Sequence, residues 1–334
     1  MPVIQNFSMY GIYDHYCCSS PPGAKTGFLH VSMYFPPDDA DDIARIIQTY
    51  SRFVILIQQN IRAVSIFQRE IQPLIHAANK PYVIVSCMDD ATFPEEVVTP
   101  DEFSGALLRH WFTINCRARS SSSSSLEGIS VPVSPIPYGV DYWTLAARTM
   151  WAKTPMASAY TQDRHLSRLR GSTVHFSKRG DGAATATAPP RIYINFQFNM
   201  DGNGNSERLL AYNTIPRDLV SIQETPINRY DTWGAYTQHV FVASPRGNGL
   251  DTIRTWEALM LGCIVIVRRI PGDGGCVLEE LYHDLPVVII DHWSSITRDF
   301  LDRILSEYTQ RTFRYEKLGT SYWIERIEAA FDAE

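Results

Sequence analysis

Residues 241–262 hold the combination of residue types best suited to ligand chemistry, because an apolar run is followed by two glycines and an amphipathic segment. The spacing predicts a strand ending at Ala243, a loop, and a helix starting near Leu250. Ligands of an open α/β sheet bind beyond the carboxyl ends of its strands. Gly247 and Gly249 lack a Cβ and allow close approach to the backbone, and a helix N-terminus attracts phosphate oxygens. The segment therefore predicts a site for a phosphate-bearing ligand.

Charged side chains around this loop can complete such a site. Arg246 and Arg254 offer guanidinium groups suited to bidentate contacts with phosphate. Glu257 lies three residues beyond Arg254 on the same predicted helix and can accept hydrogen bonds from ribose hydroxyls. Arg229 opens a second predicted helix that faces the same strand ends. We assign Arg254 to catalysis through its charge, and we predict that the ligand is bound by Arg229, Ser244, Arg246, Gly247, Asn248, Gly249, Asp251 and Glu257.

Each of these features also has a purely structural explanation. The sequence Gly247-Asn248-Gly249 is typical of a turn. Asp251 can be an acidic residue at a helix N-terminus, and Arg254 with Glu257 can form a surface ion pair. Their convergence at the end of one strand is what favours a ligand site.

The elements that must position these residues follow from apolar runs alternating with amphipathic segments, a pattern typical of parallel sheets covered on both faces. We expect strands at 81–86, 191–196, 240–243, 263–267 and 286–290, a strand or buried helix at 53–57, and helices at 101–112, 250–261, 294–306 and 322–331. The segment 131–137 is short and interrupted by prolines.

Two low-complexity stretches, 120–125 and 180–190, divide this pattern. The second precedes a new strand and has the composition of a linker. We therefore predict an α/β protein with an N-terminal Rossmann-like domain at 1–177, a flexible linker at 178–190, and a C-terminal Rossmann-like domain at 191–334. Both sheets are expected to be parallel and doubly wound, and the two domains are expected to face a cleft.

Composition excludes several classes of protein. The 334-residue chain is 45% hydrophobic and 20% charged, with a net charge of −6, so it lacks the basic surface of nucleic-acid-binding proteins. It has neither an apolar run of about 18 residues, which a membrane span requires, nor a signal-peptide pattern at its start. A soluble intracellular protein without an integral membrane segment is the simplest interpretation.

Other enzyme and metal motifs are weak or missing. The glycine loop lacks the third glycine of a dinucleotide fingerprint, and no serine-hydrolase or zinc-protease motif occurs. Asp39-Ala40-Asp41 satisfies the D-x-D pattern that holds manganese, but it immediately precedes a predicted helix, where acidic residues are favoured. We therefore predict no metal and no cofactor.

The C-terminal half resembles exostosin-like glycosyltransferases over about residues 229–295. The matching positions are Phe241, Ser244, Pro245, Gly247, Arg254, Glu257-Ala258-Leu259, Gly262-Cys263-Ile264, Ile266, Leu285-Pro286 and Trp293. This resemblance implies the two-Rossmann, GT-B architecture, with Glu257 contacting the donor ribose and residues 247–251 near the diphosphate. The chain departs from the family in having Val265 where proline is usual and no N-terminal anchor, which favours the cytoplasm over the Golgi lumen.

The resemblance implies a metal-independent glycosyltransferase, which moves a sugar from a UDP- or GDP-linked donor to a glycan, glycoconjugate or other hydroxyl acceptor. An inverting reaction, which we favour, needs a general base. Asp90 is the candidate because it follows a buried strand, although it can equally begin a turn; Asp89, Asp14 and His15 are weaker choices. A retaining enzyme needs no such base.

The second hypothesis is a non-catalytic module of the same fold that binds nucleotide sugars or glycans. The sequence does not predict the oligomeric state.

Overall fold

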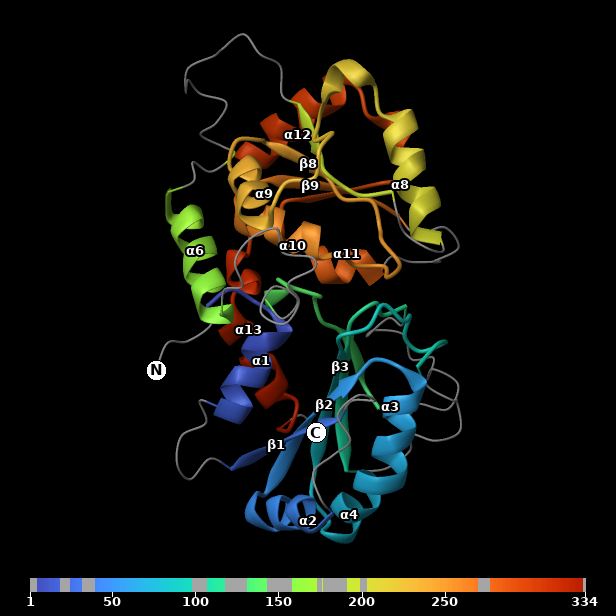
Figure 1. The fold of residues 1–334 in the computed structure, drawn as a ribbon, viewed down its shortest axis with the longest axis vertical. Helices are drawn as coiled ribbons and strands as arrows, with labels where there is room; N and C mark the ends of the chain where they lie inside the picture. Colours follow the sequence, from blue (N-terminus) through green and yellow to red (C-terminus); the bar gives the residue numbers. More distant parts are fainter. Residues whose placement is uncertain are drawn as a thin grey trace. The chain divides into compact units, whose positions relative to one another are not determined.

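The computed structural model describes residues 5–18, 25–31, 40–97, 107–117, 131–142, 158–172, 176, 191–198, 203–269 and 277–332 (Figure 1). The chain divides into two compact units. The first contains Met1–Val3, Gly11–Tyr138 and Thr320–Glu334, and the second contains Ile4–Tyr10 and Gly139–Gly319. The contacts therefore divide at Tyr138, whereas the predicted linker at 178–190 lies outside the described residues, as does the serine-rich stretch at 120–125.

The first unit is built on a five-stranded parallel sheet with the order β1-β2-β3-β4-β5. Its strands are β1 (Thr26–Val31), β2 (Arg52–Gln58), β3 (Tyr82–Cys87), β4 (Leu108–Thr113) and β5 (Val133–Pro135). Residues 53–57 are thus a strand and not a buried helix. Among the described strands the order runs in one direction, so the first sheet lacks the reversal that defines a doubly wound sheet, and the prediction is corrected in this respect.

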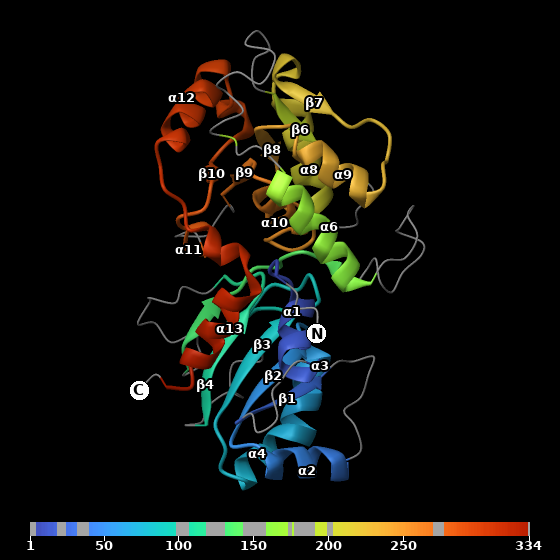
Figure 2. The same cartoon turned by 90° about the vertical axis from the view of Figure 1, so that its left-hand side faces the viewer.

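Helices of the first unit cover its sheet. They are α1 (Met9–Tyr13), which begins in the second unit, the π-helix η1 (Asp14–Cys18), α2 (Ala40–Thr49), α3 (Ile61–Ile66), the π-helix η2 (Phe67–Ile71), α4 (Gln72–Ala77) and α13 (Thr320–Ala329). Figures 1 and 2 show α3 and α4 on one side of the sheet and α13 on the other. Helix α2 begins at Ala40, whereas Asp39 and the side chain of Asp41 in the Asp39-Ala40-Asp41 motif lie outside the described part of the chain.

The helix expected at 101–112 is wrong for its last residues. Residues 108–113 form β4, which pairs with β3 on one side and β5 on the other. Leu108, Trp111 and Phe112 are buried in this strand. Their spacing fits a helix as well as a strand, and pairing with two neighbouring strands decides between the two. Residues 101–106 lie outside the described part.

The second unit has a five-stranded parallel sheet with the order β10-β9-β8-β6-β7. Its strands are β6 (Ile192–Ile194), β7 (Val220–Ile222), β8 (Phe241–Ala243), β9 (Ile264–Arg268) and β10 (Val287–Ile290). This order is doubly wound, because the chain leaves β6 for β7 on one side and returns to β8 on the other. Each strand overlaps a predicted apolar run except β7, which was not predicted.

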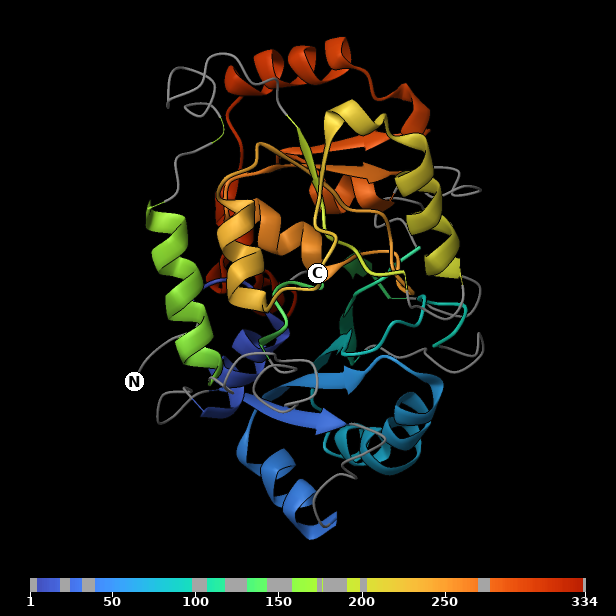
Figure 3. The ribbon, with the colours of Figure 1, turned by 45° about the horizontal axis from the view of Figure 1, so that its top comes forward.

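Helices lie on both faces of the second sheet. They are α6 (Ala159–Ser172), α8 (Asn203–Thr214), α9 (Arg229–Tyr236), α10 (Ile253–Met260), α11 (Val277–Tyr282) and α12 (Arg298–Thr309), with 3-10 turns η3 (Arg217–Leu219), η4 (Trp293–Ser295) and η5 (Tyr315–Leu318). Figure 3 shows α12 on one side of the sheet and α9 and α10 on the other.

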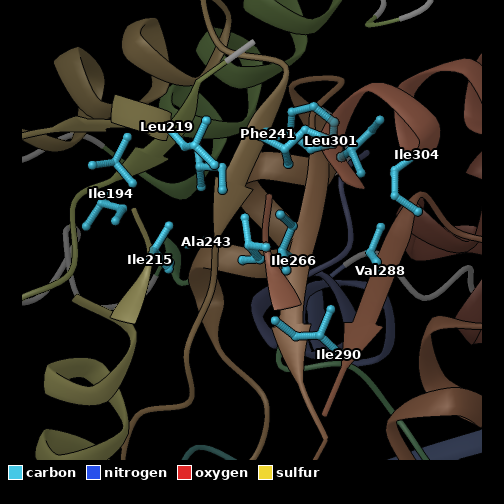
Figure 4. Close-up of a cluster of buried hydrophobic side chains, with 14 of the residues drawn as sticks. Ile194, Ile215, Leu219, Phe241, Ala243, Ile266, Val288, Ile290, Leu301 and Ile304 are labelled. Carbon is cyan, nitrogen blue, oxygen red and sulfur yellow. The ribbon is translucent and has the colours of Figure 1, made fainter. Parts of the chain in front are cut away.

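Alternate residues of the strands build the core on the α12 side (Figure 4). Ile194, Ala243, Ile266 and Ile290 come from four neighbouring strands, and Leu301 is one of the helix residues that pack on them. This close packing positions the residues that follow β6 and β8.

Candidate functional site

The reversal of strand order in the second sheet lies between β6 and β8. Ligands of open α/β sheets bind at this point, beyond the carboxyl ends of the strands. Asn195 directly follows β6, and Ser244 directly follows β8. The helix after β8 is α10, which begins at Ile253, three residues later than predicted.

A hydroxyl cluster fastens the loop after β8 to this helix. The Ser244 Oγ atom lies 2.9 Å from both Thr252 Oγ1 and Thr255 Oγ1. The backbone N–H of Ser244 donates to Ile266 O at 2.8 Å. Thr252 is the N-cap residue of α10, but its side chain makes no capping hydrogen bond to the helix. No acidic residue occupies the first turn of α10, so its N-terminal N–H groups are not neutralised by a side chain of that turn.

Arg254 extends from the first turn of α10 to the end of β6. Its Nε donates to Asn195 Oδ1 at 3.0 Å, and its guanidinium carbon lies 5.6 Å from the centre of the Phe196 ring. The Nη1 atom is buried and has no hydrogen-bond acceptor within the described ranges. No described carboxylate forms an ion pair with Arg254. Burial lowers the pKa of this guanidinium, although the nearby Tyr236 hydroxyl and Glu257 carboxylate partly offset that lowering. Arg254 is therefore a half-buried cation with one buried, unsatisfied donor and a neutral partner in Asn195.

Glu257 pairs with Arg229 and not with Arg254. Its Oε1 accepts from Arg229 Nη2 at 2.6 Å and from Nε at 2.8 Å, and the Nη1 of Arg229 donates to Asp141 O at 2.8 Å. The two paired side chains are only 16% and 6% exposed. Burial lowers the pKa of Arg229, but the charges of Glu257 and Asp141 outweigh that effect and raise it overall. Arg229, predicted to bind phosphate, thus uses all three guanidinium nitrogens within the protein.

Asp251 serves the packing of the loop. Its Oδ1 accepts from Tyr282 OH at 2.5 Å and from its neighbour's backbone, Thr252 N, at 2.8 Å. Its Oδ2 accepts from Trp256 Nε1 at 2.6 Å. This buried carboxylate connects the loop to α10 and α11, and a negative charge so occupied does not suit a diphosphate. We therefore leave Asp251 out of the proposed ligand contacts.

The remaining predicted residues form the middle of the loop. Arg246 is half-buried and forms no ion pair with a described carboxylate, and Asn248 is exposed. Gly247 and Gly249 are buried. Neither has the positive φ that would require glycine, so their close approach to a ligand stays a prediction.

The predicted base belongs to the first unit. Asp90 is exposed and lies three residues beyond the end of β3, and its backbone N–H donates to Asp89 Oδ1 at 2.8 Å. Asp89 in turn accepts from Asn60 Nδ2 at 3.2 Å. Of the weaker choices, Asp14 is buried, and burial lowers the pKa of His15. The role of Asp90 stays a prediction.

Sequence reasoning missed Asn195, Thr252 and Thr255. Asn195 was counted within the apolar run at 191–196, although a polar residue at the carboxyl end of the unit's first strand was the available signal. The two threonines carried no such signal, because hydroxyl residues near a helix start are ordinary caps.

No described helix has the length and apolar character needed to cross a membrane. No cluster of three or more His, Cys, Asp or Glu side chains suited to a metal ion occurs in the described ranges.

No protein-family model matches the chain, and no curated protein sequence matches it significantly. The resemblance to exostosin-like enzymes therefore stays a prediction.

Proposed function

We propose that this protein is a glycosyltransferase whose second unit binds the diphosphate of a UDP- or GDP-linked sugar at the reversal between β6 and β8. The sugar is transferred to a hydroxyl group of a glycan or glycoconjugate acceptor. The observation that carries this proposal is the half-buried side chain of Arg254, which has a buried, unsatisfied Nη1 and no carboxylate partner among the described residues.

A buried charge is stable only when it is paired, because removal from water costs several kcal/mol per ion. Asn195 satisfies one donor of Arg254 but brings no negative charge. An anionic ligand would supply both the missing charge and the missing acceptor. The N-cap side chain of α10 makes no hydrogen bond to the helix, so backbone N–H groups of the turn that carries Arg254 are further donors for an anion. Together these features favour a phosphate group.

Glu257 extends this proposal from phosphate to nucleotide. Both hydrogen bonds from Arg229 go to Oε1, and Oε2 accepts none from the described residues. Arg229 therefore orients the carboxylate and leaves one oxygen for a ribose hydroxyl, the role that the family resemblance implies. The buried Arg229–Glu257 pair is then a support for the ligand contact.

The chemistry proposed here needs no metal. The leaving nucleoside diphosphate gains negative charge as the bond to the sugar breaks, and fixed donors at the site stabilise that charge. Arg254 and the N–H groups of α10 supply these donors, with Arg246 as a further cation from the loop. For an inverting reaction we keep Asp90 as the predicted base, to be tested by Asp90→Asn.

A panel of UDP- and GDP-linked sugars, assayed for nucleotide release with and without oligosaccharide acceptors, tests this function. We expect one donor to be turned over by the wild type, with loss of activity in Arg254→Met. Arg303→Met is the matched control, because Arg303 is an exposed guanidinium on α12, and it should retain activity. Binding of a donor without turnover would identify the non-catalytic module, and neither binding nor turnover across the panel would contradict the proposal.

A further inference from the structure

Asn195 is the hydrogen-bond partner of Arg254, so the residue type at position 195 determines whether the positive charge of Arg254 is neutralised. It directly follows β6, and its Oδ1 accepts the Arg254 Nε hydrogen at 3.0 Å. Its other amide atom, Nδ2, donates to Tyr236 OH at 2.9 Å. The amide therefore joins the end of the strand to residues of both α9 and α10.

The orientation of this amide is fixed. A guanidinium has only donors, so the oxygen of Asn195 must face Arg254 and its NH₂ group must face the other way. Tyr236 receives that NH₂ group and is itself buried, in an edge-to-face contact with Tyr193 at 5.7 Å. Tyr193 stacks on His239 at 4.5 Å. This aromatic support holds the hydroxyl of Tyr236, and thereby the amide, in one place.

The residue type at position 195 is informative. A carboxylate of the same shape would also accept from Arg254 Nε and would do so more strongly, because a charge-assisted hydrogen bond is stronger than a neutral one. It would also cancel the charge of the guanidinium. Asparagine orients the guanidinium and leaves its positive charge for a ligand.

We infer that Asn195 is a positioning residue that orients Arg254 without neutralising it, so that the site selects ligands carrying a phosphate or diphosphate group. This inference rests on the proposed anion site, but it does not depend on which nucleotide or sugar is bound.

Titration of inorganic pyrophosphate into the wild type and Asn195→Asp tests the inference. We expect Asn195→Asp to bind pyrophosphate at least about ten-fold more weakly, because a new ion pair occupies Arg254. The unliganded variant should unfold at the same temperature as the wild type or higher, which separates a loss of charge from a loss of structure. Gln238→Glu is the matched control. Gln238 is exposed just before the amino end of β8, so this variant adds the same charge at the opposite edge of the sheet and should bind as the wild type does.

Equal pyrophosphate affinity in Asn195→Asp and the wild type would overturn the inference, and so would a wild type that binds no pyrophosphate. If Asn195→Asp does not fold, Tyr236→Phe replaces it, since loss of the hydroxyl frees the amide to rotate. Weaker pyrophosphate binding in Tyr236→Phe then supports the inference, and unchanged binding rejects it.

Turnover of nucleotide sugars is measured separately. If Asn195→Asp binds pyrophosphate more weakly but the wild type turns over no donor, the inference stands and the proposed enzymatic function is rejected. If the wild type turns over a donor but Asn195→Asp binds pyrophosphate as the wild type does, the inference is rejected and the proposed function stands.

Discussion

Two clusters of polar side chains, one at the carboxyl end of each sheet, contrast in how their hydrogen bonds are satisfied. In the first sheet, Gln59, Ser86 and Thr113 lie within one residue of the ends of neighbouring strands. They bond to one another, with Oγ of Ser86 3.1 Å from Gln59 Oε1 and 2.8 Å from Thr113 Oγ1. Gln59 Nε2 donates to Ala91 O and Ile114 O, each at 2.7 Å. In the second sheet, Arg254 keeps a buried donor without an acceptor, and no described carboxylate pairs with it.

A satisfied network needs no ligand, whereas a buried donor without an acceptor gains a hydrogen bond when an anion binds. The topology points the same way, because the strand order reverses in the second sheet and runs in one direction in the first. We therefore expect changes within the network of Gln59, Ser86 and Thr113 to affect stability alone. Changes around Arg254 should affect binding.

The largest effect on stability should come from Glu257→Ala. This variant leaves the buried Arg229 without its carboxylate, and breaking a buried pair in this way costs about 3–5 kcal/mol. Denaturant unfolding of the variant measures the loss. The double variant Glu257→Ala, Arg229→Met is the control and should recover much of the stability, because the unpaired charge is gone. A loss of under about 1 kcal/mol in the single variant would show that the pair is not a structural support.

Acid should destabilise the first unit through His110 of β4. Burial, with the charge of Arg326 adding to it, lowers the pKa of His110 to about 4, whereas the pKa of an unfolded histidine is about 6.5. Between these values the unfolded chain binds the proton more tightly, so stability is full above pH 6.5 and falls as the pH drops toward 4. The contribution reaches about 3 kcal/mol.

His110→Gln, which cannot take up this proton, isolates the effect. Its free energy of unfolding should depend less steeply on pH than that of the wild type between pH 6.5 and pH 4. Identical slopes for the two proteins would assign the acid sensitivity to other groups.

Gln59→Leu should open the network of the first sheet. The carbonyl groups of Ala91 and Ile114 and the hydroxyl of Thr113 then lose a partner, and buried polar groups left unsatisfied cost about 1–3 kcal/mol in total. Calorimetric unfolding measures the change, with the exposed Gln48→Leu as a control near zero. Nucleotide affinity should be unaffected in Gln59→Leu. A selective loss of nucleotide affinity would show that the end of the first sheet also contributes to ligand binding.

The smallest effect is expected where α13 meets the first sheet. Glu328 accepts from Arg52 Nη2 at 2.6 Å and from Tyr16 OH at 2.8 Å, but the ion pair is 24% and 29% exposed. Arg52→Met should therefore cost about 1 kcal/mol. A double-mutant cycle with Glu328→Gln measures the coupling, and a coupling above about 3 kcal/mol would mean that the pair behaves as a buried one.

The sequence predicted the strands of the second sheet well, because their apolar runs are continuous and bounded by polar residues. It could not order them, since β7 was missed and the reversal at β6 depends on it. The prediction of a helix at residues 108–112 was wrong because their apolar spacing fits a helix, and pairing with neighbouring strands overrides such a pattern.

The candidate site was predicted in part. The loop, Arg254 and Glu257 follow from local spacing along one strand, loop and helix. The pairing of Glu257 with Arg229, 28 residues away, does not follow, because it depends on the packing of α9 beside α10. The role of Asn195 depends in the same way on a contact with Arg254, 59 residues further along.

Calorimetric titration of UDP and GDP into the wild type, Arg254→Met and Arg303→Met tests the central claim most directly. We predict that one nucleotide binds the wild type and the control alike. Arg254→Met should bind it about 100-fold more weakly, as expected for the loss of one or two charged hydrogen bonds of about 1.5–3 kcal/mol each. Its unliganded stability should be unchanged or higher, because a buried donor without an acceptor is removed. Unchanged nucleotide affinity in Arg254→Met, together with reduced stability, would contradict the account and make Arg254 a structural residue.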